Sequence, residues 1–539
     1  MENYMKKCLL LFLVTGLLAG TSVGQVKFQR TYGGSGSDEG QSVVVTSDSG
    51  FVIAGHTTSN SSLNSTLFLM KLNKKGDMKW NKVIAVSTND YVRSLAQTRD
   101  SGFILCGYSV DKFGTTSPLV VKTTSLGDVQ WARTYSNSSM AYAFCAQQTH
   151  DGGYILAGYG QLIGNGWDGL LIRTDSLGNV KWQNFYGGPT TDGLDYVNEL
   201  ADGSFMAAGW NYEGGVDPNS WLLKVSSEGT ELWSNNYGGT GNEDIQAAIP
   251  SRKGGFLAAG VTTSYGGGSN NILLIKTDST GNARWMKSYG GLGDERAQAS
   301  MIENPDGSIV ITGYTSSYGA GGNGMFLLKT DSAGSLLKFK VYGGSGDEDG
   351  RAIRRTPDNG YVIVGWTASY GSGNHDVYVV KTDSNGSSGC NDVTATPTVT
   401  SIALNSILRA ASNFERRDTA IFQSGGEFAA TTLCSSDTTT GIDEAATSHV
   451  PAKFGVSQNY PNPFNPSTSF DVEVPEVGFV TVLIYNEIGQ LVDKLVQSDL
   501  NPGRHRIDWK PEGLSSGIYY YQLQIDNTIS MSRKMILLK

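Results

Sequence analysis

The sequence predicts an all-β protein whose main part is a seven-bladed β-propeller. Tryptophans recur at positions 80, 131, 182, 233 and 285, which are 51 or 52 residues apart. Each interval contains four short runs of β-branched and aromatic residues, separated by Gly, Asp, Asn and Ser. The chain has 69 glycines but only 14 prolines, which favours many tight turns. Four strands in about 50 residues is the size of a propeller blade.

The first 24 residues have the features of a secretory signal peptide. Lys6 and Lys7 precede an apolar run at 9–20, and small residues, Ser22 and Gly24, precede Gln25. A run of about 12 apolar residues is too short to span a bilayer, which takes roughly 20. We therefore expect cleavage before Gln25, export, and no transmembrane segment in the mature chain.

The repeat can be followed outward to seven copies, which start near residues 28, 80, 131, 182, 233, 285 and 338. The last copy, which ends near Cys390, lacks its fourth strand, and residues 25–32 supply a spare one. GQVKFQRTYGG at the N-terminus matches GNVKWQNFYGG of the third copy. We expect residues 25–32 to complete the seventh blade and close the ring, because closure removes exposed strand edges. The propeller is expected to span residues 25–390.

The repeat resembles bacterial seven-bladed propeller repeats with the pattern DGGYILAGYT…LLIKTDSLGNVKWQKTYGG. Its TDSxGNxxW element is similar to the tryptophan-docking motif of pyrroloquinoline quinone dehydrogenases, where the turn and the Trp lock neighbouring blades. The resemblance implies the fold, whereas one propeller frame hosts many activities. This sequence has no vicinal Cys pair of the kind those dehydrogenases carry, so no cofactor is predicted.

A Gly-rich motif, YGGSGSDEG at 32–40, occurs once per repeat in variant form. It fits the G-G-x-G-x-D register of calcium-binding β-helices, but those repeats follow each other every nine residues, so the spacing excludes that fold. An acidic residue begins the innermost strand of six copies. These six carboxylates are expected either to ring one mouth of the central channel or to accept hydrogen bonds within the turn: Asp38, Asp90, Asp192, Glu243, Glu295 and Glu348.

The loops after the second strand of each repeat vary in sequence, as binding loops do. They bring aromatic residues toward one rim of the propeller, where the rings either stack on a ligand or pack beneath the loops. The candidate ligand-binding residues are Trp167, Trp210, Tyr212, Tyr265, Tyr318, Trp366 and Tyr370.

After Cys390 the composition changes. Residues 391–434 are rich in Thr, Ser and Ala and could form a few strands packed on the propeller. Cys390 and Cys434 could form a disulfide there, since an exported chain meets oxidising conditions. Residues 435–453 are polar, acidic and without periodic apolar positions, as expected of a linker.

From residue 454 to the end, the chain resembles the C-terminal sorting domain of the type IX secretion system of Bacteroidetes-type bacteria. The matching segments, in order, are YPNPFNPST, VTVLIYNEIGQLV, GRHRIDWKPEGLSSGIYYYQL and the basic SRKMILLK. The resemblance implies a small immunoglobulin-like β-sandwich, recognition by the secretion machinery, and delivery to the outer cell surface or the medium.

The sequence contains few signs of catalysis. No two of the His residues have metal-ligand spacing, and there is no nucleophile elbow or P-loop. The net charge of −9 and the lack of a basic run argue against nucleic acid. The favoured function is ligand binding or adhesion, to a glycan or a surface protein. A propeller-based secreted enzyme, either polysaccharide-active or quinoprotein-like, and a purely structural surface component are the alternatives.

Overall fold

The computed structural model describes two parts of the chain, which form two compact units, Met1–Thr438 and Thr439–Lys539. The described residues are 25–402 without 60–63, 136–139, 162–165, 189 and 213–216; 416–417, 421–423 and 429–436; and 455–538 without 458, 460–461, 475–477, 488–489, 501–502, 512 and 526–527. The expected signal peptide at 1–24 and most of the expected linker lie outside them. The described residues form strands and turns with no helix.

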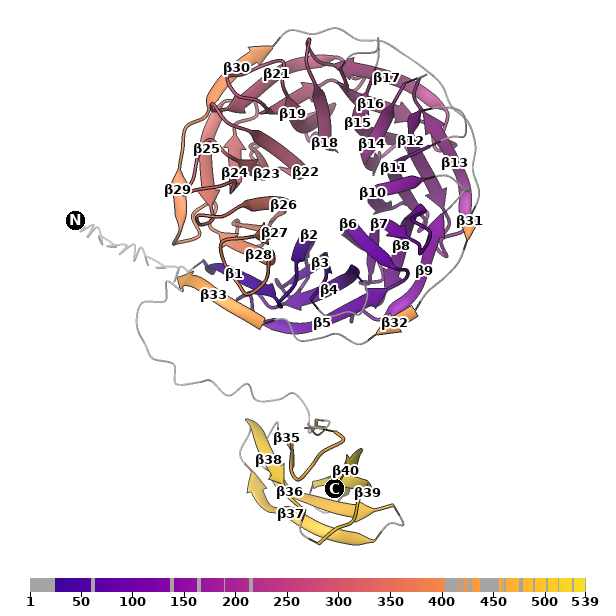
Figure 1. Cartoon of the computed structure of the whole chain (residues 1–539), viewed down its shortest axis with the longest axis vertical. Coiled ribbons are helices and arrows are strands. Elements are labelled where there is room, and N and C mark those ends of the chain that lie inside the picture. Colours follow the sequence, from indigo (N-terminus) through magenta and orange to yellow (C-terminus); the bar gives the residue numbers. More distant parts are fainter. Residues whose placement is uncertain are drawn as a thin grey trace, which may run out of the picture. The chain divides into compact units, whose positions relative to one another are not determined.

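The first unit contains seven antiparallel sheets in its described residues, arranged around a central axis (Figure 1). The first three sheets contain β2 (Asp38–Val45), β3 (Phe51–Thr57), β4 (Thr66–Leu72) and β5 (Met78–Ala85); β6 (Asn89–Gln97), β7 (Phe103–Val110), β8 (Thr116–Thr123) and β9 (Val129–Tyr135); and β10 (Ala141–Gln148), β11 (Tyr154–Gln161), β12 (Trp167–Thr174) and β13 (Val180–Tyr186).

The next three sheets repeat this order, with the first strand innermost. They contain β14 (Asp192–Glu199), β15 (Phe205–Asn211), β16 (Asn219–Val225) and β17 (Glu231–Tyr237); β18 (Glu243–Pro250), β19 (Phe256–Thr262), β20 (Asn271–Thr277) and β21 (Ala283–Gly290); and β22 (Glu295–Glu303), β23 (Ile309–Thr315), β24 (Gly324–Thr330) and β25 (Leu336–Tyr342).

The seventh sheet joins the two ends of the repeat region. It contains β26 (Glu348–Arg355), β27 (Tyr361–Thr367), β28 (Asp376–Thr382) and the N-terminal strand β1 (Lys27–Gly33). β1 pairs antiparallel with β28, with Phe28 opposite Lys381 and Tyr32 opposite Val377. The N-terminal strand therefore occupies the place that the fourth strand of each other repeat occupies in its sheet.

The burial of each strand follows from its place in the sheet. The second strands, such as FVIAGHT in β3, are buried on both faces because neighbouring sheets cover them. The fourth strands, such as VKWQNFY in β13, alternate between buried and partly exposed residues because they lie at the periphery. Apolar side chains from adjacent sheets form shared clusters, for example Ala54 and Leu69 of the first sheet with Leu105 and Val121 of the second.

Neighbouring sheets are also joined by a repeated polar contact. The hydroxyl of Tyr186, at the end of β13, donates a hydrogen bond to the carbonyl of Gly229 in the next sheet over 2.6 Å. The outer tryptophans contact the same type of turn. Gly178 has φ of 78° and lies against the ring of Trp131, where an added Cβ would come within 3.1 Å. Glycine is therefore required by both the positive φ and the close approach.

The segment after the repeats forms an outer belt, defined here as strands β29 (Asp392–Thr394), β30 (Thr398–Ile402), β31 (Arg416–Arg417), β32 (Ile421–Gln423) and β33 (Ala429–Ser436). In chain order these strands pair with the outer strands β25, β21, β9, β5 and β1. The belt strands thus pair in turn with the sixth, fifth, second, first and seventh sheets, at the periphery of the first unit (Figure 1). Each belt strand covers an edge that would otherwise expose unpaired backbone groups.

The second unit consists of two small antiparallel sheets. One contains β34 (Gly455–Val456), β35 (Thr468–Val474) and β38 (Gly503–Trp509); the other contains β36 (Gly478–Asn486), β37 (Leu491–Leu500), β39 (Gly517–Ile525) and β40 (Thr528–Leu537). Residues of both sheets share one apolar core, including Phe470 and Trp509 of the first and Val482 and Tyr521 of the second. This shared core makes the unit a β-sandwich.

Candidate ligand-binding cavity

A β-bulge interrupts the innermost strand of every sheet in the first unit. The register with the second strand shifts after the third or fourth residue, which leaves one residue, or three in β22, outside the ladder. A bulge bends its strand and re-aims a side chain. Each bulge contributes one residue, or two in β22, to the lining of one cavity near the central axis: Gln41, Arg93, Phe144, Asp195, Gln246, Gln298 with Ala299, and Arg351.

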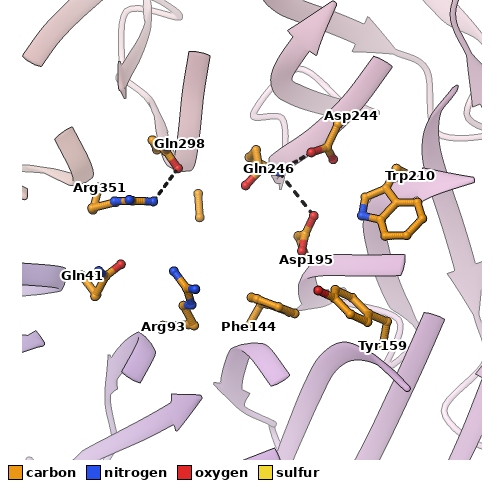
Figure 2. Close-up of a pocket in the computed structure, with 11 residues that line it drawn as sticks. Gln41, Arg93, Phe144, Tyr159, Asp195, Trp210, Asp244, Gln246, Gln298 and Arg351 are labelled. Atoms are coloured by element: carbon orange, nitrogen blue, oxygen red, sulfur yellow. Dashed lines mark hydrogen bonds between the residues drawn. The ribbon is translucent and has the colours of Figure 1, made fainter. Parts of the chain in front are cut away.

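The cavity has a volume of about 300 Å³, at the lower end of the range for small-molecule sites. Tyr159 of β11, Trp210 of β15 and Asp244 of β18 complete the lining. Figure 2 shows these side chains converging on a shared space from different strands. Aromatic rings therefore lie beside amide, carboxyl and guanidinium groups in a single concave site.

Two carboxyl groups lie together on one side of the cavity. The amide nitrogen of Gln246 donates hydrogen bonds to Asp244 and, over 3.4 Å, to Asp195. Burial raises the pKa of Asp244 to about 6, and burial together with the nearby Asp244 raises the pKa of Asp195 well above its usual value. Both shifts move the carboxyl groups toward their neutral forms, because ionised carboxylates are poorly solvated there.

The two arginines of the cavity differ in their partners. Arg351 is held in an ion pair with Asp349 at 3.0 Å and donates to Gln298 at 3.3 Å. Arg93 instead lies over the rings of Tyr108 and Phe144, each with its centroid 5.7 Å from the guanidinium carbon. Among the described residues, Arg93 has no carboxylate partner, and its one hydrogen bond goes to the Tyr108 hydroxyl at 3.5 Å. Its charge is therefore available to a ligand.

A continuous group of aromatic rings extends from the cavity across neighbouring sheets. Phe144 stacks on Tyr159 at 5.2 Å, and Tyr159 contacts Trp210 at 5.9 Å. Further members contact these or each other within about 6 Å, and all are partly buried: His56, Tyr91, Tyr108, Tyr142, Trp167 and Tyr212. Aromatic rings thus form much of the lining, and charged groups lie beside them, as Arg93 does over Phe144.

The six predicted acidic residues lie inside the turns. Every one is fully buried. The carboxylate of Glu243, for example, accepts from the Gly239 N–H at 2.7 Å and from the hydroxyl of Thr262 at 2.6 Å. A backbone N–H four residues upstream donates to each of the others as well: Asp38, Asp90, Asp192, Glu295 and Glu348. Every repeat with this acid therefore uses it to fix the turn that leads into the innermost strand, a turn that is Gly-rich in all of them except at Asp90.

The predicted aromatic residues fall into two sets. Trp167, Trp210 and Tyr212 belong to the aromatic group at the cavity. The others are brought into separate local contacts. The hydroxyls of Tyr265 and Tyr318 donate to the carbonyls of Gly238 and Gly290 at 3.1 and 3.4 Å, Trp366 stacks on His375 with centroids 4.1 Å apart, and Tyr370 lies 6.2 Å from Tyr378.

Sequence reasoning missed the bulge residues, although a signal for them is present. They lie three positions after the acidic residue of each repeat, or after its equivalent Ala141, and they read Gln, Arg, Phe, Asp, Gln, Gln and Arg. The residue directly before each of them is small or apolar and buried in every repeat, as packing against the next sheet requires. A position that varies within an otherwise regular repeat is where one blade differs functionally from another.

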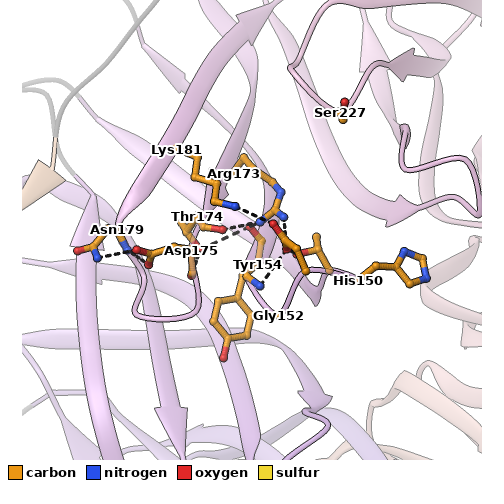
Figure 3. A network of polar contacts seen from close by, with 12 residues as sticks. His150, Gly152, Tyr154, Arg173, Thr174, Asp175, Asn179, Lys181 and Ser227 are labelled. Atoms are coloured by element: carbon orange, nitrogen blue, oxygen red, sulfur yellow. Dashed lines mark hydrogen bonds and ion pairs between the residues drawn. The ribbon is translucent and has the colours of Figure 1, made fainter.

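The turns between the first and second strands of a sheet lie at the other end of the strands from the turns that hold the buried acids, and salt bridges stabilise them. Asp151 accepts hydrogen bonds from Arg173, from Lys181 at 2.7 Å and from the Thr149 hydroxyl at 2.7 Å (Figure 3). Burial acts to raise the pKa of Asp151, but these donors outweigh burial and hold it well below its usual range. Equivalent pairs join Lys71 to Asp48 and Lys381 to Asp358. The turns at this end are similar from sheet to sheet, and their ion pairs stabilise the fold.

The cysteines of the first unit have two states. Cys106 and Cys145 are free and buried, with thiol pKa values raised by burial. Cys390 is disulfide-bonded. The backbone of β33 places Cys434 opposite Gln29 of β1, and the Gln29 amide donates to the Cys390 carbonyl at 2.6 Å. The side chain of Cys434 lies outside the described part of the chain, so its pairing with Cys390 stays a prediction.

Comparison with known families identifies the C-terminal module. Residues 458–538 match the secretion system C-terminal sorting domain. This match indicates that the chain is a secreted cargo protein of a type IX secretion system, recognised by that machinery and delivered for surface attachment. None of the curated proteins matches the chain. Among the described residues, the structure contains no helix with the length and apolar character needed to cross a membrane.

Several solved structures are weakly similar to the chain. They include Sqt1 from Chaetomium thermophilum, with 9% identity over 63% of this chain and 82% of that chain (TM-score 0.39). PorZ, a surface component of the type-IX secretion system of Porphyromonas gingivalis, has 10% identity over 93% and 81% (TM-score 0.29). A eukaryotic initiation factor has 11% identity over 73% and 98% (TM-score 0.30). At these scores the similarities support no conclusion about function.

Proposed function

We propose that the protein is a surface-displayed binding module. In this proposal residues 25–390 form a seven-bladed propeller closed by β1, residues 391–434 brace it, residues 435–453 link it to the sorting domain at 454–539, and residues 1–24 are removed on export. The propeller binds its ligand at the cavity on the central axis. The module needs no metal or cofactor for this role.

The observation that carries the proposal is the difference between the bulge residues of successive sheets. Packing requirements are alike in every sheet, so they produce alike residues, as the buried acids show. At the bulges the chain instead places Arg93, Phe144 and Asp195 side by side in consecutive sheets. A pocket that is mostly aromatic on one side and carries a few converging polar groups has the composition of a ligand site.

The loops of the wider rim are a second part of the proposed surface. Trp167 and Tyr212 extend the aromatic group outward from Trp210. Tyr265, Tyr318, Trp366 and Tyr370 would add contacts for a ligand that reaches beyond the cavity. Aromatic rings of this kind suit stacking on sugar rings or an amphipathic protein surface.

An array of glycans and surface proteins, probed with the chain from Gln25 to Lys539, tests the proposal. The matched variant is Trp210→Ala, which removes one wall of the cavity. We expect at least one ligand on the array whose binding falls tenfold or more in this variant, while the thermal midpoint changes little. If no array ligand depended on the cavity residues, the binding function would be refuted.

The carboxyl pair supports one second candidate, a glycan-cleaving enzyme. Asp195 and Asp244 lie close together with raised pKa values, and a protonated carboxylic acid beside a second carboxyl group is the arrangement that glycoside hydrolysis uses. Release of reducing sugar from a polysaccharide panel, lost in Asp244→Asn, would favour the enzyme. Binding without release would favour the binding module.

A further inference from the structure

The side chains that line the cavity, in addition to its size, indicate the chemistry of its ligand. Its three groups of side chains are an aromatic wall, a carboxyl pair with its bridging amide, and an arginine without a carboxylate partner among the described residues. Each group restricts the chemistry of what can bind. The inference drawn from them rests on the proposed function, because it takes the cavity to be the ligand site.

The aromatic wall favours a flat, partly apolar ligand face. Phe144 and Tyr159 come from one sheet and Trp210 from the next, and all three are partly buried, so part of each ring is accessible from the cavity. The C–H face of a pyranose ring packs against such rings, and its edge carries hydroxyl groups. About 300 Å³ provides space for a single sugar unit with little to spare.

The polar groups favour a ligand edge that both donates and accepts hydrogen bonds. Oδ1 of Asp244 is buried without a partner, and the carboxyl group of Asp195 and the amides of Gln41 and Gln246 also line the cavity. Sugar hydroxyls can donate to the carboxyl oxygens and accept from the amides. A purely apolar ligand would leave these groups unsatisfied, at a cost in affinity.

The arginines of the cavity favour a negatively charged sugar over a neutral one. Arg351 is paired with Asp349, whereas Arg93 is held in place by stacking and, among the described residues, has no carboxylate within ion-pair distance. A planar guanidinium binds a carboxylate through two parallel hydrogen bonds. The raised pKa values of Asp195 and Asp244 reduce the negative charge in the cavity, and so reduce the repulsion of an entering anion.

We propose that the cavity binds a sugar ring bearing a carboxylate, with the carboxylate on Arg93 and the ring against Phe144, Tyr159 and Trp210. The same chemistry is offered by a free acidic monosaccharide and by the acidic end of a longer glycan. The exposed part of the aromatic group, through Trp167 and Tyr212, would contact further units of the longer ligand.

The test uses the chain from Gln25 to Lys539 and three probes, D-glucuronate, D-galacturonate and N-acetylneuraminate, each paired with its methyl ester. Binding is measured by calorimetry and by ligand-observed NMR. At least one acid is expected to bind at least tenfold more tightly than its ester. An oligosaccharide ending in that acid, tested in the same way, is expected to bind more tightly than the monosaccharide if the rim contributes, and equally if the cavity alone binds.

Variants assign the effect to the arginine. Arg93→Gln is expected to abolish the preference for acid over ester, and Arg93→Lys is expected to retain part of it because the charge remains. Arg133→Gln is the matched control, since Arg133 lies over Trp131 in the same way at 5.6 Å but does not line the cavity. Arg133→Gln should leave the preference unchanged.

Three results would overturn the proposal: no binding of any of the acids, equal binding of acid and ester, or a preference that survives in Arg93→Gln. These failures are distinguishable from failure of the binding function itself. A neutral ligand whose binding is lost in Trp210→Ala would refute the acidic sugar and leave the binding module intact.

Discussion

The hydroxyl of Tyr32 donates a hydrogen bond to the backbone carbonyl of Gly76 over 2.5 Å. Tyr32 lies in β1, in the sheet with β28, whereas Gly76 lies in the turn between β4 and β5 of the first sheet. The same bond joins Tyr186 to Gly229 and Tyr289 to Gly334 in consecutive sheets. The N-terminal strand is thus connected to the first sheet by the contact that connects the other sheets to each other.

Removing this strand should destabilise the first unit more than removing one equivalent hydrogen bond. Tyr32→Phe is expected to cost about 1 kcal/mol, the usual value for one buried hydrogen bond, and Tyr186→Phe should cost about the same. Deleting residues 25–33 removes all pairing with β28 and exposes a strand edge, so the deletion should lower the denaturation midpoint much further and promote aggregation. An unchanged midpoint in the deletion variant would contradict ring closure by β1.

The stability of the first unit should fall as pH rises through the titration of the carboxyl pair. The folded-state pKa of Asp244 is raised to about 6, and that of Asp195 is raised well above its unfolded value of about 3.9. The folded state therefore binds more protons than the unfolded state above pH 4, and the free energy of unfolding decreases as pH rises toward and past 6. Asp195→Asn should flatten this dependence.

Denaturant titrations between pH 4 and pH 8 measure that slope. Burial also raises the pKa of Asp168 to about 6, with a further contribution from the charge of Asp192. The informative quantity is therefore the difference in free energy of unfolding between the wild type and Asp195→Asn at each pH. A difference that is constant from pH 4 to pH 8 would show that the carboxyl pair does not titrate as described.

The outer belt should depend on a disulfide between Cys390 and Cys434. Closing a loop of this length stabilises a protein by about 2 to 4 kcal/mol. Cys434→Ser should lower the thermal midpoint under oxidising conditions and should have no effect in the presence of reductant. Peptide mapping without reduction should recover the two cysteines in one linked fragment. Recovery of a free Cys434 thiol from the oxidised protein would exclude the bond.

Deleting residues 454–539 should leave a folded first unit in the periplasm. The sorting-domain match covers 458–538, and the second unit has an apolar core of its own. Fractionation of cells expressing the truncated and full-length chains measures the distribution. Arrival of the truncated protein at the cell surface would show that the C-terminal module is not the sorting signal.

The repeated sheets could be predicted from the sequence, because every sheet has to make the same packing contacts and therefore carries similar residues. The strand pattern, the tight turns and the outer tryptophans all follow from what each sheet needs in order to pack on the next, so four-stranded antiparallel sheets could be predicted. The sorting domain was equally accessible, from four ordered segments. The acids were recognised as a repeated feature, but only the structure shows that a carboxylate such as Glu243 is enclosed by its turn.

Strand periodicity alone could not predict the cavity, for a physical reason. The side chains that line it are directed inward by bulges, and a bulge changes the alternation on which strand periodicity depends. By periodicity, Arg93 and Phe144 therefore look like ordinary strand residues. The sequence instead indicated the variable loops as the ligand-binding surface. For residues 391–434 the sequence indicated only a few strands packed on the propeller. Their partners could not be predicted, because these short strands gain stability from pairing with β25, β21 and the other outer strands and not from an apolar pattern of their own.

Blocking the cavity is the most direct test that it binds the ligand. Ala299 lines the cavity and is exposed, so Ala299→Cys can be modified with a bulky maleimide, while Leu292→Cys, at a side chain that is 90% exposed and does not line the cavity, serves as the control. The free cysteines Cys106 and Cys145 are buried and should not react. Modification at 299 should abolish binding of the array ligand with an unchanged thermal midpoint, and modification at 292 should not. Full binding by the protein modified at 299 would contradict a ligand site in the cavity.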